Sequence, residues 1–289
     1  MRKPVWSASA ALLGTACVFW AAGAWGSEPL RGVFALQGGT PKTDAYLVNA
    51  QAGTDPLVRQ LDLWLTPSGA SAPIRTYEVD MTKMLHAVII SDDFRVFIHA
   101  HPQLEPSGHF LSAQTLPQPG LYHLFADGEP SGAGQQVFRF DLLAGPPVPN
   151  DPRARDLSER SATCAVDGYT VTLSSLALKA GGESMLDVHI LRGGKPASDL
   201  HPYLGSLAHA VFIDANDLTY VHVHPMALGA NGGGMAGMRG MSATEMNDEE
   251  SAADMTLHVS VLESGTYKLW LQFAGGAGLH VAQFVLNAS

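Results

Sequence analysis

The chain contains one histidine pattern twice. In the first copy, His86 precedes the motif His99-Ala100-His101-Pro102, and in the second, His209 precedes His222-Val223-His224-Pro225. The distance from the single histidine to the His-x-His motif is 13 residues in both copies (99 − 86 and 222 − 209). Three imidazoles on one small surface are a donor set that Cu(II) and Zn(II) favour. The pattern therefore predicts one three-histidine metal site per copy, formed by His86, His99 and His101 and by His209, His222 and His224.

Each copy predicts a β-hairpin that brings its three rings together. If Asp92-Asp93 is a two-residue loop, His86 lies directly opposite His99. Opposed residues on one face are about 4.5–5.5 Å apart, and His101, two residues further along the strand, shares that face. The second copy repeats this pairing around Ala215-Asn216. The same geometry also allows the rings simply to hydrogen-bond across the hairpin, which would give them a structural role.

A methionine-rich stretch offers a second kind of ligand. Met235, Met238 and Met241 lie in an insertion at 226–254, among glycines, alanines and acidic residues that cannot build a core. Thioether sulfur prefers soft ions such as Cu(I), whereas imidazole suits Cu(II) or Zn(II). The spacing predicts a mobile loop that captures Cu(I). The alternative is a low-complexity linker that happens to be rich in methionine.

The segments that carry these motifs predict an all-β protein of two tandem antiparallel β-sandwiches, Greek-key and cupredoxin- or immunoglobulin-like. The repeats are expected at 55–145 and 161–289, with a proline-rich linker at 146–160 and an unassigned N-terminal segment at 27–54. Short stretches rich in Val, Ile, Leu, Tyr and Phe, bounded by Gly, Pro and Asp, predict the strands. They are 59–66, 75–80, 84–91, 94–101, 109–115, 120–126 and 136–143 in the first unit, and 168–178, 184–191, 207–214, 218–224, 255–262, 266–273 and 278–287 in the second.

Residues 1–26 are typical of a secretory signal peptide, with a basic start, an apolar stretch and a small-x-small end at Gly26. We therefore expect a periplasmic or secreted protein cleaved before Ser27, with a lipoprotein anchored through Cys17 as the alternative. Removing Arg2 and Lys3 leaves 15 of the 17 basic residues against 27 acids, a net charge of −12. Such a charge argues against nucleic acid and anionic membranes as partners and suits a protein that meets cations. The remaining cysteine, Cys164, is expected to be a buried small hydrophobic residue.

The histidine motifs and their surroundings resemble those of bacterial secreted proteins of unassigned function. The resemblance rests on 84–93 with 97–102 and on 199–205 with 208–209 and 221–225. It implies tandem β-sandwiches and copper or other heavy-metal handling. Pro119-Gly-x-Tyr122 and the methionine stretch also look like periplasmic copper-resistance carriers. That likeness implies copper as the cofactor, with zinc possible, and another periplasmic metal-handling protein as partner. The carriers' N-terminal ligand has no counterpart here, since 27–85 contain no histidine.

Signatures of nucleophilic hydrolases, phosphate-binding loops and dinucleotide sites are absent from the sequence. We therefore expect a metal-binding protein that is not an enzyme. A structural module of the cell envelope without metal is the second hypothesis, and a three-histidine metalloenzyme with Glu105 as general base is the third. Residues that could support the ligands through hydrogen bonds are Glu105, His109, His123, His201 and His258.

Overall fold

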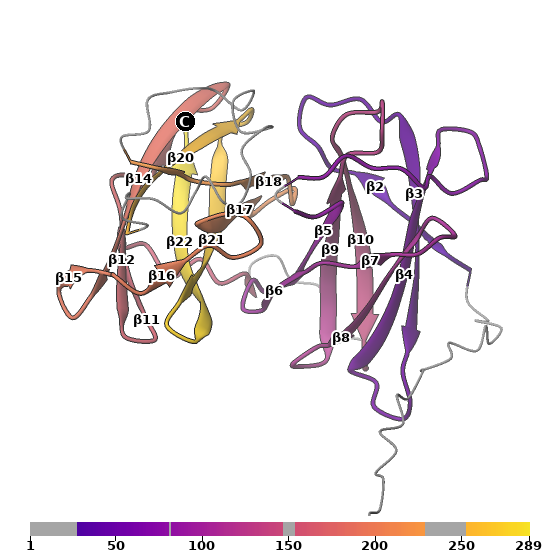
Figure 1. The fold of residues 1–289 in the computed structure, drawn as a ribbon, viewed down its shortest axis with the longest axis horizontal. Coiled ribbons are helices and arrows are strands. Elements are labelled where there is room, and N and C mark those ends of the chain that lie inside the picture. Colours follow the sequence, from indigo (N-terminus) through magenta and orange to yellow (C-terminus); the bar gives the residue numbers. More distant parts are fainter. Residues whose placement is uncertain (1–27, 81, 147–153, 229–252) are drawn as a thin grey trace, which may run out of the picture.

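The computed structural model describes residues 28–80, 82–146, 154–228 and 253–289, and within them the protein is all-β. Two sandwiches of two sheets each, antiparallel except for the parallel pair β13–β22, lie side by side, the N-terminal one in indigo to magenta and the C-terminal one in rose through orange to yellow (Figure 1). The predicted fold class is therefore confirmed. In the described ranges, no helix has the length and apolar character that crossing a membrane would require.

The first sandwich pairs a sheet of order β1-β3-β4-β8-β7 with a sheet of order β2-β10-β9-β5-β6. Its core contains side chains such as Leu63, Phe110 and Phe140, all at most 2% exposed. The strands are β1 (Leu30–Arg31), β2 (Val33–Phe34), β3 (Thr43–Gln51), β4 (Val58–Pro67), β5 (Leu85–Ser91), β6 (Phe97–Ala100), β7 (Gln103–Leu104), β8 (His109–Thr115), β9 (Gly120–Gly128) and β10 (Gln136–Ala144).

The second sandwich repeats this order. The sheet β13-β22-β21-β17-β18 corresponds to β2-β10-β9-β5-β6, and β11-β12-β14-β20-β19 corresponds to the other sheet. Its strands are β11 (Thr163–Val166), β12 (Tyr169–Leu173), β13 (Ala177–Leu178), β14 (Gly182–Arg192), β15 (Lys195–Pro196), β16 (Leu200–His201), β17 (Ala208–Asp214), β18 (Tyr220–Val223), β19 (Met226–Ala227), β20 (Asp254–Val261), β21 (Gly265–Gly275) and β22 (Gly278–Ala288).

Three stretches differ from the sequence-based expectations. The N-terminal segment supplies β1, β2 and β3, and β3 pairs with β4 along all nine of its residues, so the first sandwich begins well before residue 55. The stretch 75–80 forms only isolated bridges, among them Tyr77 to Pro130. The expected strand 168–178 is interrupted because Ser174 leaves the ladder, and β13 then joins the opposite sheet beside β22.

The two histidine hairpins have longer loops than the sequence suggested. In the first, Ser91 N donates to Val96 O at 3.1 Å, which leaves four residues in the loop rather than two. Val88 therefore lies opposite His99, and His86 is level with His101. The second hairpin has the same register, with Val211 opposite His222. The predicted pairing was wrong by two residues, but an even shift keeps all three rings of a copy on one face.

Both faces of β5 and of β17 are buried. Leu85 and Ile89 of β5 point into the core of the first sandwich, whereas Val88 and Ile90 point the other way, into a third cluster between the sandwiches. Val211 and Ile213 of β17 enter the same third cluster from the other side. The two sandwiches therefore pack sheet against sheet through an apolar interface, and the alternating histidines lie on its face.

Trp270 of β21 is central to this interface. It is fully buried and its ring lies 5.6 Å from both Phe94 and Phe97, which come from the first hairpin. Replacing Trp270 by alanine should lower the free energy of unfolding by about 3–5 kcal/mol, because the cavity cannot fully collapse. Urea denaturation checks this value, with Leu143→Ala, which truncates a side chain 44% exposed, as the control that should change little. A loss below about 1 kcal/mol would mean that the interface contributes little to stability.

Candidate metal centre

Six histidines meet at the boundary of the two sandwiches. Ring centroids of His86 and His222, from different units, are 5.0 Å apart, and those of His99 and His209 are 4.8 Å apart. The sequence predicted two three-histidine sites, and the structure unites them in one group. We call the set the histidine cluster: His86, His99, His101, His209, His222 and His224.

The cluster has an approximate twofold symmetry that follows from the duplicated hairpins. Within the copies, His99 and His101 are 4.5 Å apart and His222 and His224 are 4.6 Å apart. The two distances between units given above also correspond to each other. Because each hairpin contributes the same face to the interface, each ring of one copy has an equivalent in the other.

Four members of the cluster could hold one metal ion. His86, His99, His209 and His222 each offer a ring nitrogen, and these four atoms all lie within 4.8 Å of one another. Nitrogens that share one tetrahedral ion at 2.0–2.1 Å are about 3.3 Å apart, so small movements would close the set. We call these residues the inner four. A second group that could hold an ion consists of Asp80, His86 and His224.

Hydrogen bonds on the outer side of the rings direct lone pairs inward. His86 Nε2 faces the carbonyl oxygen of Asp80 at 3.4 Å, and His209 Nε2 faces that of Tyr203 at 3.0 Å. A carbonyl only accepts, so both Nε2 atoms carry the proton and both Nδ1 atoms keep a lone pair. Each acceptor lies six residues before its histidine, which places equivalent turns under the two rings.

The His-x-His pairs are supported by residues of the opposite sandwich. His99 Nδ1 lies 3.1 Å from Gln272 Oε1 on β21, and His222 Nδ1 lies 3.5 Å from Asp127 Oδ2 on β9. Asp127 and Gln272 are equivalent positions, since Asp127 pairs with His86 and Gln272 with His209 in their own sheets. Donation from His99 Nδ1 to Gln272 leaves Nε2 of His99 as the inward atom, and the contact with Asp127 places Nδ1 of His222 on the corresponding outer side of its ring.

The inward atoms form an electron-rich centre. His86 Nδ1 and His99 Nε2 are 3.2 Å apart, close to the separation of two nitrogens on one ion. His222 Nε2 is buried without a hydrogen-bond partner in the described part of the chain. Buried polar atoms are normally paired, so an unpaired nitrogen beside opposed lone pairs points to a cation as the missing partner.

Burial keeps the rings neutral. Burial, followed by the effect of neighbouring imidazoles, lowers the pKa of His99 and of His224 to about 2 and that of His209 to about 4. The same burial raises the pKa of Asp127 to about 7. Neutral imidazoles are the form that binds metal, so the cluster is ready to bind at neutral pH.

The residues that the sequence suggested as supports for the ligands have other partners. His109 pairs with Asp62 at 2.6 Å, and His123 lies between Asp92 and Asp141 at 2.9 and 2.8 Å. His258 pairs with Glu183 at 2.9 Å, His201 faces the carbonyl of Asp199, and Glu105 is exposed between β7 and β8. The actual supports, Asp127 and Gln272, are far in sequence from the histidines that they contact, and only the packing of the two sandwiches brings them together.

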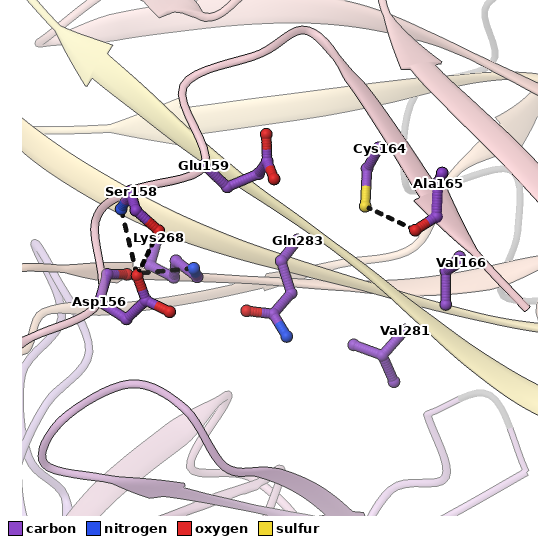
Figure 2. A pocket seen from close by; sticks show the side chains of 9 residues that line it. All are labelled: Asp156, Ser158, Glu159, Cys164, Ala165, Val166, Lys268, Val281 and Gln283. Carbon is purple, nitrogen blue, oxygen red and sulfur yellow. Dashed lines mark hydrogen bonds between the residues drawn. The ribbon is translucent and has the colours of Figure 1, made fainter.

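Other sequence predictions fall elsewhere. Met235, Met238 and Met241, like the signal segment 1–26, lie outside the described residues. Cys164 is only partly buried and lines a separate pocket of about 310 Å³ in the second sandwich (Figure 2). Lys268, which also lines this pocket, donates to the carbonyl of Asp156 at 3.1 Å and so connects the linker to β21.

Comparisons with known proteins place the chain in a family without assigning a function. No curated protein matches it. A solved structure, the FN1–FN3 domains of chicken CNTN1, is 10% identical over 83% of this chain and 66% of that one, with a TM-score of 0.20, too low to carry an argument. A family model described as a domain of unknown function, DUF8832, matches residues 42–144 and 164–289, which cover most of the two sandwiches. The chain therefore belongs to the DUF8832 family.

Proposed function

We propose that this protein binds a single metal ion between its two sandwiches through the inner four histidines. The observation that carries the proposal is the convergence of four neutral imidazoles from both units, two buried and two partly buried, each with one nitrogen within 4.8 Å of the others. Four nitrogen donors complete a tetrahedral set, whereas catalytic zinc sites keep one position open for water or substrate. This is why we favour a binding role over an enzymatic one.

Copper is the ion that we favour, with zinc as the alternative. Imidazole suits both Cu(II) and Zn(II), and Cu(II) binds nitrogen sites more tightly. The copper proposal is further supported by the resemblance to copper-resistance carriers and by the methionine-rich stretch at 226–254, whose role in Cu(I) capture stays a prediction. The signal-like residues 1–26 support action in the periplasm or outside the cell.

The proposal is tested by removing one support of the site. Asp127→Ala should weaken Cu(II) and Zn(II) binding about 10–100-fold while the stoichiometry stays the same, because His222 loses the acceptor that orients its ring. Competition against a chelator of known affinity measures the change. Asp141→Ala, which removes a partner of His123 outside the cluster, is the matched control. Equal affinities in both variants would show that Asp127 does not support a metal site.

One observation favours a structural role instead. His224 Nε2 lies 3.0 Å from His209 Nδ1, so the rings can also bond to each other without an ion. In that case a chelator leaves the melting temperature unchanged. Under the metal proposal, an ion at 100 times its Kd stabilises the fold by about 2.7 kcal/mol, which a melt with and without chelator detects.

A further inference from the structure

Three of the inner four are closed off from solvent, and the fourth, His99, is partly buried. His209 is fully buried, His86 is 2% exposed and the side chain of His222 is 2% exposed. An ion must therefore pass other residues to reach them. The twofold symmetry offers two equivalent sides, one beside His224 and one beside His101.

These two sides carry different residues at equivalent positions. Asp80 lies six residues before His86, and Tyr203 lies six residues before His209. Both main chains accept the same hydrogen bond from the histidine that follows, so their side chains start from corresponding places. At this position the first copy has an acid, Asp80, and the second copy has a phenol, Tyr203. The two sides are therefore chemically unequal.

On the first side, the exposed carboxylate of Asp80 lies within 4.8 Å of ligand nitrogens on His86 and His224. One carboxylate and two imidazoles are a donor set found in three-ligand zinc sites, where a fourth position stays open to water. On the other side, the Tyr203 ring lies 6.4 Å from the His101 ring and 5.9 Å from the His209 ring. A neutral phenol there covers the rings and offers a hydrated cation no charge.

We propose that Asp80, His86 and His224 form the port through which a divalent ion enters and leaves the inner four. This inference rests on the proposed function and adds the route. An ion captured at the port loses water to a mixed oxygen and nitrogen set, then exchanges Asp80 and His224 for His99, His209 and His222. His86 belongs to both groups and remains bound throughout, so the ion is never without protein ligands in the buried region.

Because His86 belongs to both groups, the two groups should hold one ion rather than two. Two divalent ions that compete for one imidazole would repel each other strongly at so short a distance. The port is therefore a transfer site. Loss of the port should change the rates at which the metal binds and leaves, whereas the equilibrium affinity for the metal should stay almost the same.

The experiment measures how fast Cu(II) binds and leaves, by stopped-flow quenching of tryptophan fluorescence in the purified protein. In Asp80→Asn, loading and release should both slow at least about tenfold while the equilibrium affinity changes less than about threefold. Asp80→Glu, which keeps the carboxylate, should recover most of the rate. Glu78→Gln removes another exposed acid two residues earlier and controls for general attraction of the cation.

Two results would overturn the port. Loading of Asp80→Asn at the wild-type rate would show that the ion takes another route, and equal slowing in Glu78→Gln would reduce the effect to long-range charge. Either result leaves the inner four intact as a site. If the wild-type protein binds no Cu(II) or Zn(II) at all, the proposed function itself fails, and the port fails with it.

Discussion

Replacing His99 and His222 together by alanine should reduce the affinity for Cu(II) and Zn(II) more than a thousandfold. These residues are two of the inner four, one from each sandwich. Structural zinc sites with four ligands bind with about 10–16 kcal/mol, so two ligands account for roughly 5–8 kcal/mol. Because 1.4 kcal/mol is a factor of ten, this loss corresponds to a rise in Kd of more than three orders of magnitude.

Calorimetric titration of the purified protein measures this loss. His109→Ala/His258→Ala removes the same number of imidazoles from the outer faces, where each pairs with an acid, and should bind as the wild type does. A His99→Gln/His222→Gln variant keeps polar side chains at the interface and shows whether any loss follows from unfolding. Wild-type stoichiometry and affinity in a folded double variant would exclude the inner four as the site.

The second large effect is acid destabilisation of the metal-free protein. Burial lowers the pKa of His99, His209 and His224 to about 2, 4 and 2, whereas histidine in the unfolded chain has a pKa near 6.5. Below pH 6.5 the unfolded chain takes up protons at these residues and the folded protein does not. Stability is therefore full above pH 6.5 and falls as the pH drops, by about 1.4 kcal/mol per unit for each residue.

Asp127 acts in the opposite direction. Its pKa is raised to about 7, so between pH 7 and 4 the folded protein holds a proton that the unfolded chain has lost. This offsets about one of the three histidines, so these four residues together cost roughly 3 kcal/mol per pH unit between pH 6 and pH 5. His86, His101 and His222, whose pKa values burial also lowers, add to the loss in the same direction. Urea denaturation at pH 7, 6 and 5 measures this loss of stability. The free energy of unfolding of the His99→Gln/His224→Gln variant should fall much less over the same pH range. A flat profile would mean that these rings are not buried as neutral groups.

The sequence predicted the ligands better than the hairpins that carry them. The loops were mispredicted because Phe94 and Leu218 adopt positive φ angles of 61° and 64°, which apolar residues rarely do. Burial of Phe94 against Trp270 stabilises that conformation, and no local signal indicates it. The three histidines of each copy still share one face, as predicted, because side chains alternate with a period of two along a strand and the predicted register was wrong by two.

The sequence contains a signal that the two histidine triads meet. Val88 and Ile90 share the face of His86, and Val211 and Ile213 share the face of His209. A strand whose outward-facing residues are also apolar must bury its outer face as well as its inner one. The equivalent apolar faces could have indicated that the hairpins pack together. The supporting residues Asp127 and Gln272 gave no such signal, since their contacts depend on how the two sandwiches dock.

The central claim is that one ion is shared by both sandwiches. Elemental analysis of the wild-type protein, loaded with excess Cu(II) or Zn(II) and freed of unbound metal by gel filtration, tests it directly. We expect one tightly held ion per chain, because the inner four come from both units. Two equivalent ions per chain would contradict this claim and mean that each histidine triad binds its own ion. A protein that retains no metal would mean that the cluster is only a structural feature of the interface.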